Sequence, residues 1–277
     1  MKRLFPFLAF VLLLPALAGA QQVTFNMQVP QEGTTRAIVD SMELVFLISV
    51  NAEGADQSFD MTQAKRQAYT ETILAADDQR ILKRKVSYTD ATERGNQPMQ
   101  GLKTVSLPVS GKSYILEYIA DSLAITAEDG ATVSKEERGA LEGTFRRNTD
   151  GQFSSILNGR TMSVGEEIEL TAEMLDQFGA GLTAGPMKLN SAKIKLVNVH
   201  DVQGMLAALL DVSVVMIGTQ GTMEMEFAMN GTAEIGVENL WPLSFVMKGT
   251  VTGAGNHAGM DLTADGDMRM ARTATYK

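Results

Sequence analysis

A strict two-residue alternation near the C-terminus constrains the fold of this chain more than any other feature. Over residues 223–238, apolar side chains hold one parity and polar or acidic side chains hold the other. The apolar set is Met223, Met225, Phe227, Met229, Ala233, Ile235 and Val237. Successive side chains of a strand point to opposite faces of its sheet, whereas a helix would spread them around its circumference. The segment is therefore predicted to be a strand with one buried face and one solvated face.

The same alternation recurs on both sides of this segment, so residues 187–276 are predicted to form a run of antiparallel strands. The further inward-facing residues are Ala192, Ile194, Leu196, Ala208, Leu210, Val212, Val214, Met216, Leu243, Phe245, Met247, Val251, Met260, Leu262, Ala264, Met268 and Met270. Glycines followed by threonine recur inside these segments. Glycine within a strand often marks a bulge or a strong bend, which a large curled sheet needs.

The N-terminal part also contains strand-like segments. Residues 23–29 alternate, and residues 38–50 have a main apolar row with Val45 and Leu47 on the opposite parity. A strand that is apolar on both faces is usually covered on both sides, so we expect cover on both faces of 38–50. Residues 59–74 fit either a helix or a strand.

Turn residues divide the next part of the chain. Asp77-Asp78 is predicted to be the tip of a hairpin that leads into a strand over 81–88. Residues 89–101 contain Gly, Asn and Pro with little periodicity, so they are predicted to be a loop. Residues 114–119 and 123–126 are predicted to form a second hairpin.

Apart from residues 59–74, which are left open, helices are predicted in the middle of the chain. Ser134 and Glu137 have the spacing of a capping box, in which each side chain binds the backbone N–H of the other. A short helical piece is expected at 153–157, and 161–170 is read as a strand. Thr171 is predicted to cap a last helix that ends at Gly179-Ala-Gly181.

These elements predict a mainly β (α+β) fold: a large, strongly curved antiparallel sheet or half-barrel that carries a few short helices from the middle of the chain. Residues 21–277 are expected to form a single β-rich domain, with a subdivision near residue 130 as the alternative. The segments 22–130 and 131–277 then have either one core or two.

The first 20 residues have the pattern of a secretory signal peptide. Lys2 and Arg3 precede an apolar stretch over 4–17, and Ala18-Gly19-Ala20 ends it with small residues. The alternative is an uncleaved anchor, but the apolar stretch is shorter than the roughly 20 residues that span a bilayer. We therefore expect a protein exported to the periplasm or cell surface, with no membrane span after cleavage.

Charge and cysteine content limit the classes of partner and chemistry. Without Lys2 and Arg3, 22 basic residues face 33 acidic ones, which gives a net charge of about −11. Such a surface repels nucleic acid and anionic headgroups, so neither is expected as a partner. The chain has no cysteine, which excludes disulfides, thiol catalysis and cysteine-ligated metals.

Methionine provides the candidate binding site. Ten of the 17 methionines lie between Met187 and Met270. Methionine is flexible and polarisable, so it adapts to irregular apolar partners. The candidate ligand-binding residues are Met223, Met225, Phe227, Met229, Phe245, Met247, Met260 and Met268. They line either a groove for a lipid-like ligand or an ordinary packed core.

Other motifs do not lead to a catalytic, cofactor or metal site. Residues 261–267 resemble the start of a calcium loop, but the twelfth position is Arg272 instead of a bidentate Glu. Gly111-Lys112-Ser113 lacks the earlier glycine of a phosphate-binding loop. His200 and His257 belong to no catalytic pattern. No catalytic residue, cofactor or metal ligand is predicted.

Three segments resemble a family of exported bacterial proteins of unknown function. They are Gly111–Tyr114, Gly159–Gly165 and Gly231–Leu243. The resemblance implies no activity and supplies no catalytic residues. At the level of fold, the predicted curved sheet also looks like the half-barrel carriers of lipids and lipoproteins in the bacterial envelope.

The leading hypothesis is a non-enzymatic envelope protein that binds an apolar ligand or a partner protein on the Met-lined sheet face, with helix 134–147 as its lid. The alternative is a structural or interaction protein of the cell surface with a dry core. A hydrolase would need a pair of carboxylates about 5–10 Å apart in a cleft, and no spacing in the sequence indicates one.

Overall fold

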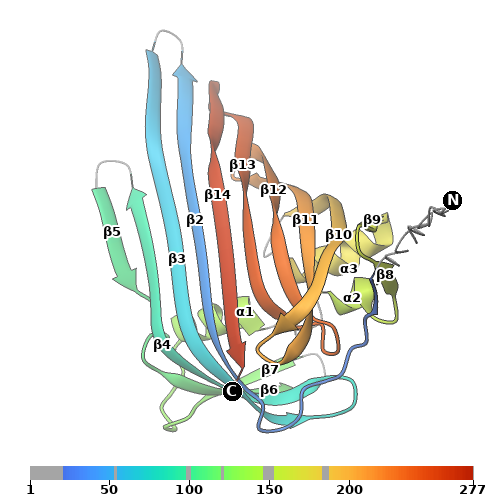
Figure 1. Cartoon of the computed structure of the whole chain (residues 1–277). Coiled ribbons are helices and arrows are strands. Elements are labelled where there is room, and N and C mark those ends of the chain that lie inside the picture. The colour runs from blue at the N-terminus through green and yellow to red at the C-terminus, as the bar shows by residue number, and fades with distance from the viewer. Residues whose placement is uncertain are drawn as a thin grey trace, which may run out of the picture.

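The computed structural model describes residues 21–52, 55–97, 101–119, 122–145, 153–182 and 187–276. Figure 1 shows a large twisted sheet with the helices on one side. The long strands are β2 (Thr35–Ala52), β3 (Ala55–Ala76), β4 (Ile81–Gln97), β10 (Lys188–Val202), β11 (Met205–Gln220), β12 (Met223–Gly236), β13 (Pro242–His257) and β14 (Met260–Tyr276). The shorter strands of the same sheet are β5 (Gly101–Ser106), β6 (Ser113–Ile119), β7 (Ser122–Ala127) and β9 (Glu167–Glu169).

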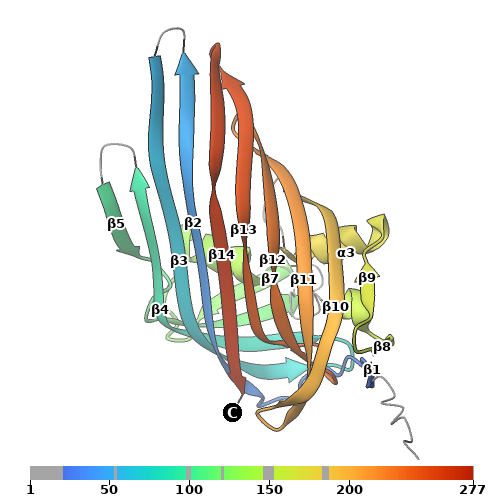
Figure 2. The ribbon, with the colours of Figure 1, turned by 45° about the horizontal axis from the view of Figure 1, so that its top comes forward.

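These twelve strands form one antiparallel sheet in the order β7-β6-β4-β3-β2-β14-β13-β12-β11-β10-β9, with β5 paired to β4. Most neighbours follow each other in sequence, so the sheet is built mainly from hairpins. The exception at the centre is β14, which pairs with β2 from Asp261↔Asn51 to Tyr276↔Arg36. The sheet is open, because β7 and β9 end the order and do not pair with each other in the described part of the chain. Figure 2 shows the long strands bending together toward the C-terminus of β14.

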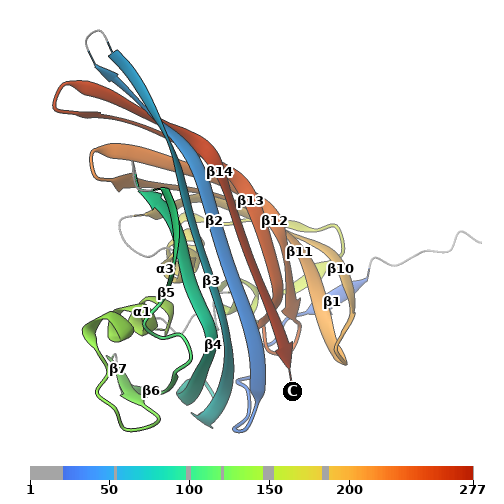
Figure 3. The same ribbon diagram turned by 90° about the vertical axis from the view of Figure 1, so that its left-hand side faces the viewer.

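Three short helices occur in the described residues: α1 (Lys135–Phe145), α2 (Ser154–Leu157) and α3 (Ala172–Leu182). Figure 3, seen from the side, places α1 and α3 on the concave side of the sheet. A separate two-stranded sheet joins β1 (Gln22–Thr24) to β8 (Thr161–Ser163). The prediction of a large curved antiparallel sheet with a few short helices from the middle of the chain is confirmed.

The concave face holds most of the core. The largest buried cluster combines inward side chains of β10–β14 with residues of α2 and α3, including Leu157 and Phe178. A second cluster joins α1 to β4, β6 and β7 through Leu141, Phe145 and Tyr114. The helices therefore cover apolar surface that a one-sided sheet leaves open to water.

Strand β12 has the predicted buried face and the predicted solvated face. Met223, Met225, Phe227 and Met229 are buried, whereas Glu224, Glu226 and Asn230 are exposed. The capping box of α1 is also present. The Ser134 N–H donates to Glu137 Oε2 at 2.6 Å, and the Glu137 N–H donates to Ser134 Oγ at 3.2 Å.

Two predictions for the N-terminal half were wrong. The predicted loop over 89–101 is strand as far as Gln97, because β4 continues alongside both β3 and β5. The expected cover on both faces of residues 38–50 is absent for the described residues, since Val45 and Leu47 are 44% and 42% exposed. Their β-branched and aliphatic side chains suit a strand without being buried.

Other element boundaries differ from the expected ones. Residues 59–74, left open between helix and strand, lie within β3. The predicted strand over 23–29 ends at Thr24, and the backbone beyond it bonds to loops, as in Asn26 N–H to Val237 O at 3.1 Å. The predicted strand 161–170 is two short strands, β8 and β9, and α3 continues to Leu182 beyond its glycines.

No helix in the portion of the chain that the structure describes combines the length and apolar character needed to cross a bilayer.

Candidate functional site

A cavity of about 330 Å³ lies between the concave face of the sheet and the helices. Its wall draws on β2, β3, β11, β12, β13 and β14, together with α1, α3 and Phe153 directly before α2. Strands from both ends of the sequence meet here because β14 pairs with β2. The site is therefore formed only when β14 has joined the N-terminal strands β2 and β3 to the C-terminal strands β11, β12 and β13.

One side of the cavity is apolar. It is lined by Val212, Val214 and Met216 from β11, Met229 from β12, and Phe245 and Met247 from β13. Phe153 and Phe178 close it from the helical side, with their ring centroids 5.6 Å apart. The Thr171 hydroxyl accepts from the Met174 N–H at 3.4 Å, so the predicted cap helps to hold the first turn of the helix that carries Phe178.

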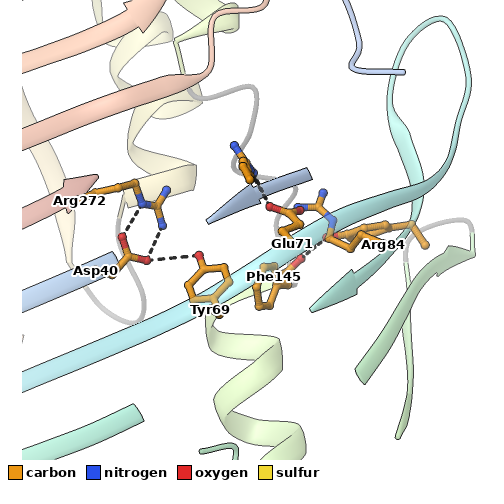
Figure 4. A network of polar contacts seen from close by, with 8 residues as sticks. Asp40, Tyr69, Glu71, Arg84, Phe145 and Arg272 are labelled. Carbon is orange, nitrogen blue, oxygen red and sulfur yellow. Dashed lines mark hydrogen bonds and ion pairs between the residues drawn. The ribbon is translucent and has the colours of Figure 1, made fainter. Parts of the chain in front are cut away.

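The other side is polar, and its central feature is an ion pair. The Arg272 guanidinium donates to both oxygens of Asp40, at 2.6 Å from Nε and 2.9 Å from Nη2. The Tyr69 hydroxyl donates to Asp40 Oδ2 at 3.3 Å, and Figure 4 shows the three side chains converging at the inner face. Two parallel bonds between guanidinium and carboxylate fix the position of both groups.

The pKa values of this group reflect burial and charge. Burial is the largest effect on Tyr69 and raises the pKa of its phenol well above the usual value. Burial alone would lower the pKa of Arg272, but its hydrogen bonds to Asp40 more than offset this and raise it. Arg272 and Tyr69 therefore keep their protons at any physiological pH.

Two further polar side chains of β3 line the same cavity, Lys65 and Gln67. Gln67 is 5% exposed, and its Nε2 has no hydrogen-bond partner in the described residues. Lys65 is half-buried, and no ion pair is found for it among the residues that the structure describes. A buried donor without an acceptor destabilises the folded protein and calls for a functional explanation.

A second charged group lies next to the first and is fully buried. Glu71 accepts from Arg36 at 2.7 Å and also pairs with Arg84, and all three residues are at most 5% exposed. The guanidinium of Arg36 lies 4.0 Å from the centre of the Trp241 ring. Figure 4 shows Glu71 beside Arg84, on the same face of β3 as Tyr69. These residues do not line the cavity, so their role is to join β2, β3 and β4.

Helix α1 supplies Gly143 and Thr144 to the cavity wall. At its other end, the Glu137 carboxylate accepts from Lys112 Nζ at 2.5 Å and from the Tyr114 hydroxyl at 2.8 Å. The hydrogen bond from Lys112, then that from the Ser134 N–H, then that from Tyr114 lower the pKa of Glu137 to about 2. One end of α1 is thus fixed to β6 while the other end borders the cavity.

The structure brings three of the eight predicted ligand-binding residues to this cavity: Met229, Phe245 and Met247. Met223, Met225 and Phe227 are buried in the main core cluster, and Met268 packs against it half-buried. Met260 is half-buried at the start of β14, next to the turn from β13. That any of them contacts a ligand stays a prediction.

The polar side of the cavity was missed from the sequence, although a signal was present. Asp40 has the same parity as the inward-facing Ile38 and Met42, and Arg272 lies between Met270 and the buried Ala274 in the same way. A charged residue at an inward position of an apolar strand is rare and is normally paired. Lys65 and Gln67 were hidden because their segment was not assigned to a strand.

The remaining motifs lie outside the cavity. Residues 261–267 are part of β14, and His200 Nε2 lies 3.1 Å from Glu234 Oε1. The Ser244 hydroxyl donates to the same carboxylate at 2.8 Å, so the serine contacts the acid and not the imidazole. Over the described ranges, no group of three or more His, Asp or Glu side chains is arranged to hold a metal ion.

Comparison with known proteins gives little further information. No family model matches this chain. No curated protein matches it either. Among solved structures, it is similar to DynF from the dynemicin biosynthesis pathway of Micromonospora chersina, at 9% identity over 92% of this chain and 86% of that chain, with a TM-score of 0.22. It is also similar to a DUF1329 family protein from Desulfovibrio piger ATCC 29098, at 8% identity over 86% of this chain and 85% of that one, with a TM-score of 0.15. At these values neither likeness informs the function of this chain.

Proposed function

We propose that this protein binds an apolar small molecule in the cavity between its concave sheet face and its helices, without catalysing a reaction. The observation that carries the proposal is the cavity itself, of about 330 Å³ and lined by Met229, Phe245 and Met247. Ligand pockets start at about 300 Å³, so this cavity has the size of a small ligand site.

The composition of the wall supports the same proposal. Methionine and phenylalanine provide a large apolar surface, and methionine adapts to ligands of irregular shape. The polar groups are few and lie together on one side, at Asp40, Lys65, Gln67 and Arg272. A mainly apolar pocket with a small number of convergent polar groups is typical of small-molecule sites.

We also propose that the protein acts outside the cytoplasm. Its support is the basic, apolar and small-residue order of the first 20 residues, which is that of a signal peptide. A non-enzymatic carrier of the cell envelope agrees with this leader and with the low number of polar groups at the site. Helix α1 is the proposed lid, because Gly143 and Thr144 border the cavity.

A blocking substitution with a matched control tests the proposal. Met247 and Val246 are neighbours in β13 on opposite faces, the first 2% exposed and lining the cavity, the second 39% exposed on the outer face. We expect Met247→Trp to fill the cavity and Val246→Trp to leave it open. The probe is N-phenyl-1-naphthylamine, a neutral apolar molecule whose fluorescence rises in an apolar site.

The expected result is saturable probe binding by the wild-type protein and by Val246→Trp, with at least tenfold weaker binding by Met247→Trp. Mass spectrometry of the wild-type protein, purified without detergent and run native and then denatured, would identify a ligand retained from the cell. Equal probe binding by the two tryptophan variants would show that the cavity is not the binding site.

A second candidate function is that of a structural or interaction protein of the cell surface. The observation that favours it is β5, whose six residues are all exposed and which pairs with β4 and with no other strand of the described residues. Leu102 and Val105 on this strand are 47% and 54% exposed. Exposed edge strands pair readily with other chains. Self-association on size-exclusion chromatography that is lost in Val105→Lys would favour this function.

A further inference from the structure

We infer that the ligand has an anionic, carboxylate-like head group that binds Lys65 and Gln67, with a single apolar chain extending along Met229, Phe245 and Met247. This inference rests on the proposed function and specifies the chemical class of its ligand. It depends on the charge balance at the polar side of the cavity, on an unsatisfied buried donor, and on the cavity volume.

The charge balance leaves one positive charge in the wall. Asp40 and Arg272 neutralise each other through two hydrogen bonds, and the Tyr69 hydroxyl also donates to Asp40. Lys65 lies beside this pair, because Met42↔Lys65 and Asp40↔Gln67 are successive inward-facing pairs of β2 and β3. The polar side thus presents a lysine ammonium that the Asp40 carboxylate does not compensate.

The nearest other carboxylate in the register is Glu93, the partner of Lys65 on β4. It accepts a hydrogen bond from Gln63 Nε2 at 3.4 Å, and no ion pair joins it to Lys65 in the structure of the described residues. Arg66, the neighbour of Lys65 in β3, pairs with Asp90 on the exposed side. Lys65 therefore remains available to an anion inside the cavity.

Gln67 adds a directed donor to this charge. It lies two residues from Lys65 on the same face of β3, and its buried Nε2 has no acceptor in the part of the chain described. A ligand oxygen placed between the two side chains would accept from both. A carboxylate satisfies this arrangement because it only accepts hydrogen bonds and carries the opposite charge to lysine.

The volume limits the rest of the ligand. A cavity of about 330 Å³ is at the lower end of the range of ligand pockets. It suits one short aliphatic chain better than the two chains of a phospholipid. The apolar side chains of β11, β12 and β13 provide the surface for that chain.

The experiment compares two ligands that differ only in the head group, decanoate and decan-1-ol. Each displaces N-phenyl-1-naphthylamine from the wild-type protein, from Lys65→Met and from Gln67→Met. Lys248→Met is the control for loss of one positive charge, because Lys248 is exposed on the outer face of β13. The melting temperature of each variant verifies that it is folded.

We expect decanoate to displace the probe from wild type at about a tenfold lower concentration than decan-1-ol. A charge-assisted hydrogen bond to the head group contributes about this difference in affinity. Lys65→Met and Gln67→Met should each reduce this preference severalfold and leave decan-1-ol unaffected, whereas Lys248→Met should keep it. Equal displacement by both ligands in wild type, or an unchanged preference in both cavity variants, overturns the head-group inference alone. Failure of the wild-type protein to bind the probe overturns the proposed function as well.

Discussion

Arg272 and Asp40 are direct partners in the register of β14 with β2, and two hydrogen bonds join their side chains across 232 residues of sequence. The pair links the last long strand to the first one and also lines the cavity. One contact therefore contributes both to the assembly of the sheet and to the polar side of the candidate site.

Breaking this pair should destabilise the fold. In Asp40→Asn the Arg272 guanidinium loses its countercharge in a mostly buried place, so we expect the free energy of unfolding to fall by about 1–3 kcal/mol. Urea denaturation followed by circular dichroism measures this. The double variant Asp40→Leu/Arg272→Met should recover most of the loss, and a single variant as stable as wild type would contradict the role assigned to the pair.

The buried Glu71 should matter more. Glu71→Gln removes the carboxylate charge that pairs with both Arg36 and Arg84, and we expect a loss of about 3–5 kcal/mol in the free energy of unfolding. The control is Glu117→Gln, which removes an exposed ion pair with Lys83 and should cost about 1 kcal/mol or less. The same denaturation experiment measures both variants, and equal losses would rule out this ranking.

Acid should weaken the attachment of α1. The pKa of Glu137 is lowered from 4.5 to about 2 by its hydrogen bonds from Lys112, Ser134 and Tyr114. A lowered folded-state pKa contributes stability that is present above pH 4.5 and is lost as the pH falls through 2. The stability difference between wild type and Glu137→Gln should therefore shrink from pH 6 to pH 2. A difference that stays constant over this range would show that the charge of Glu137 is not involved.

Two glycine substitutions should have opposite effects. A Cβ at Gly249 of β13 would lie 1.9 Å from the Ala228 carbonyl oxygen, so Gly249→Ala must displace the β12 backbone. We expect a loss of about 2 kcal/mol or more from such strain. At Gly139 in α1 a Cβ would meet no atom within 4 Å, and Ala there should stabilise by up to about 1 kcal/mol. Thermal unfolding of the two variants gives the comparison.

Gln67→Met should increase stability while it weakens ligand discrimination. Removing a buried donor that lacks a partner relieves a cost of about 1–3 kcal/mol, and methionine nearly preserves the side-chain shape. The carboxylate preference should fall in the same variant. A variant that loses both stability and preference would indicate that Gln67 has a structural role instead.

The strand alternation was enough to predict the sheet, because inward side chains such as Met225 and Phe227 pack on one continuous core. It was insufficient where burial does not follow hydrophobicity. Val45 and Leu47 are apolar yet exposed, since none of the described residues forms a second layer over the outer face of the sheet at that point. Gly95 and Asn96 indicated a loop, but Asn96 is held in β4 by hydrogen bonds to the Thr62 N–H and the Asp60 carbonyl of β3.

The candidate site was predicted only in part. Met229, Phe245 and Met247 were predicted because each lies at an inward-facing position of an alternating strand. The polar side depends on strands that become adjacent only when β14 pairs with β2. No local pattern places Arg272 beside Asp40. Parity alone also cannot separate a methionine at a cavity from one in packed core, so Met223 and Met225 were grouped with the cavity residues.

The central position of β14 has a consequence for how the chain reaches its native state. Until β14 (Met260–Tyr276) is in place, the edges of β2 and β13 that it joins have no partner strand. The strands β2–β7 and β9–β13 then form two separate sheets. Contacts that are distant in sequence form slowly, since the intervening chain must first be ordered. A chain released before these residues are made would hold two exposed inner edges, each ready to pair with another molecule. Folding should therefore begin from the complete polypeptide, because β2 keeps an exposed edge until its partner strand β14 is present.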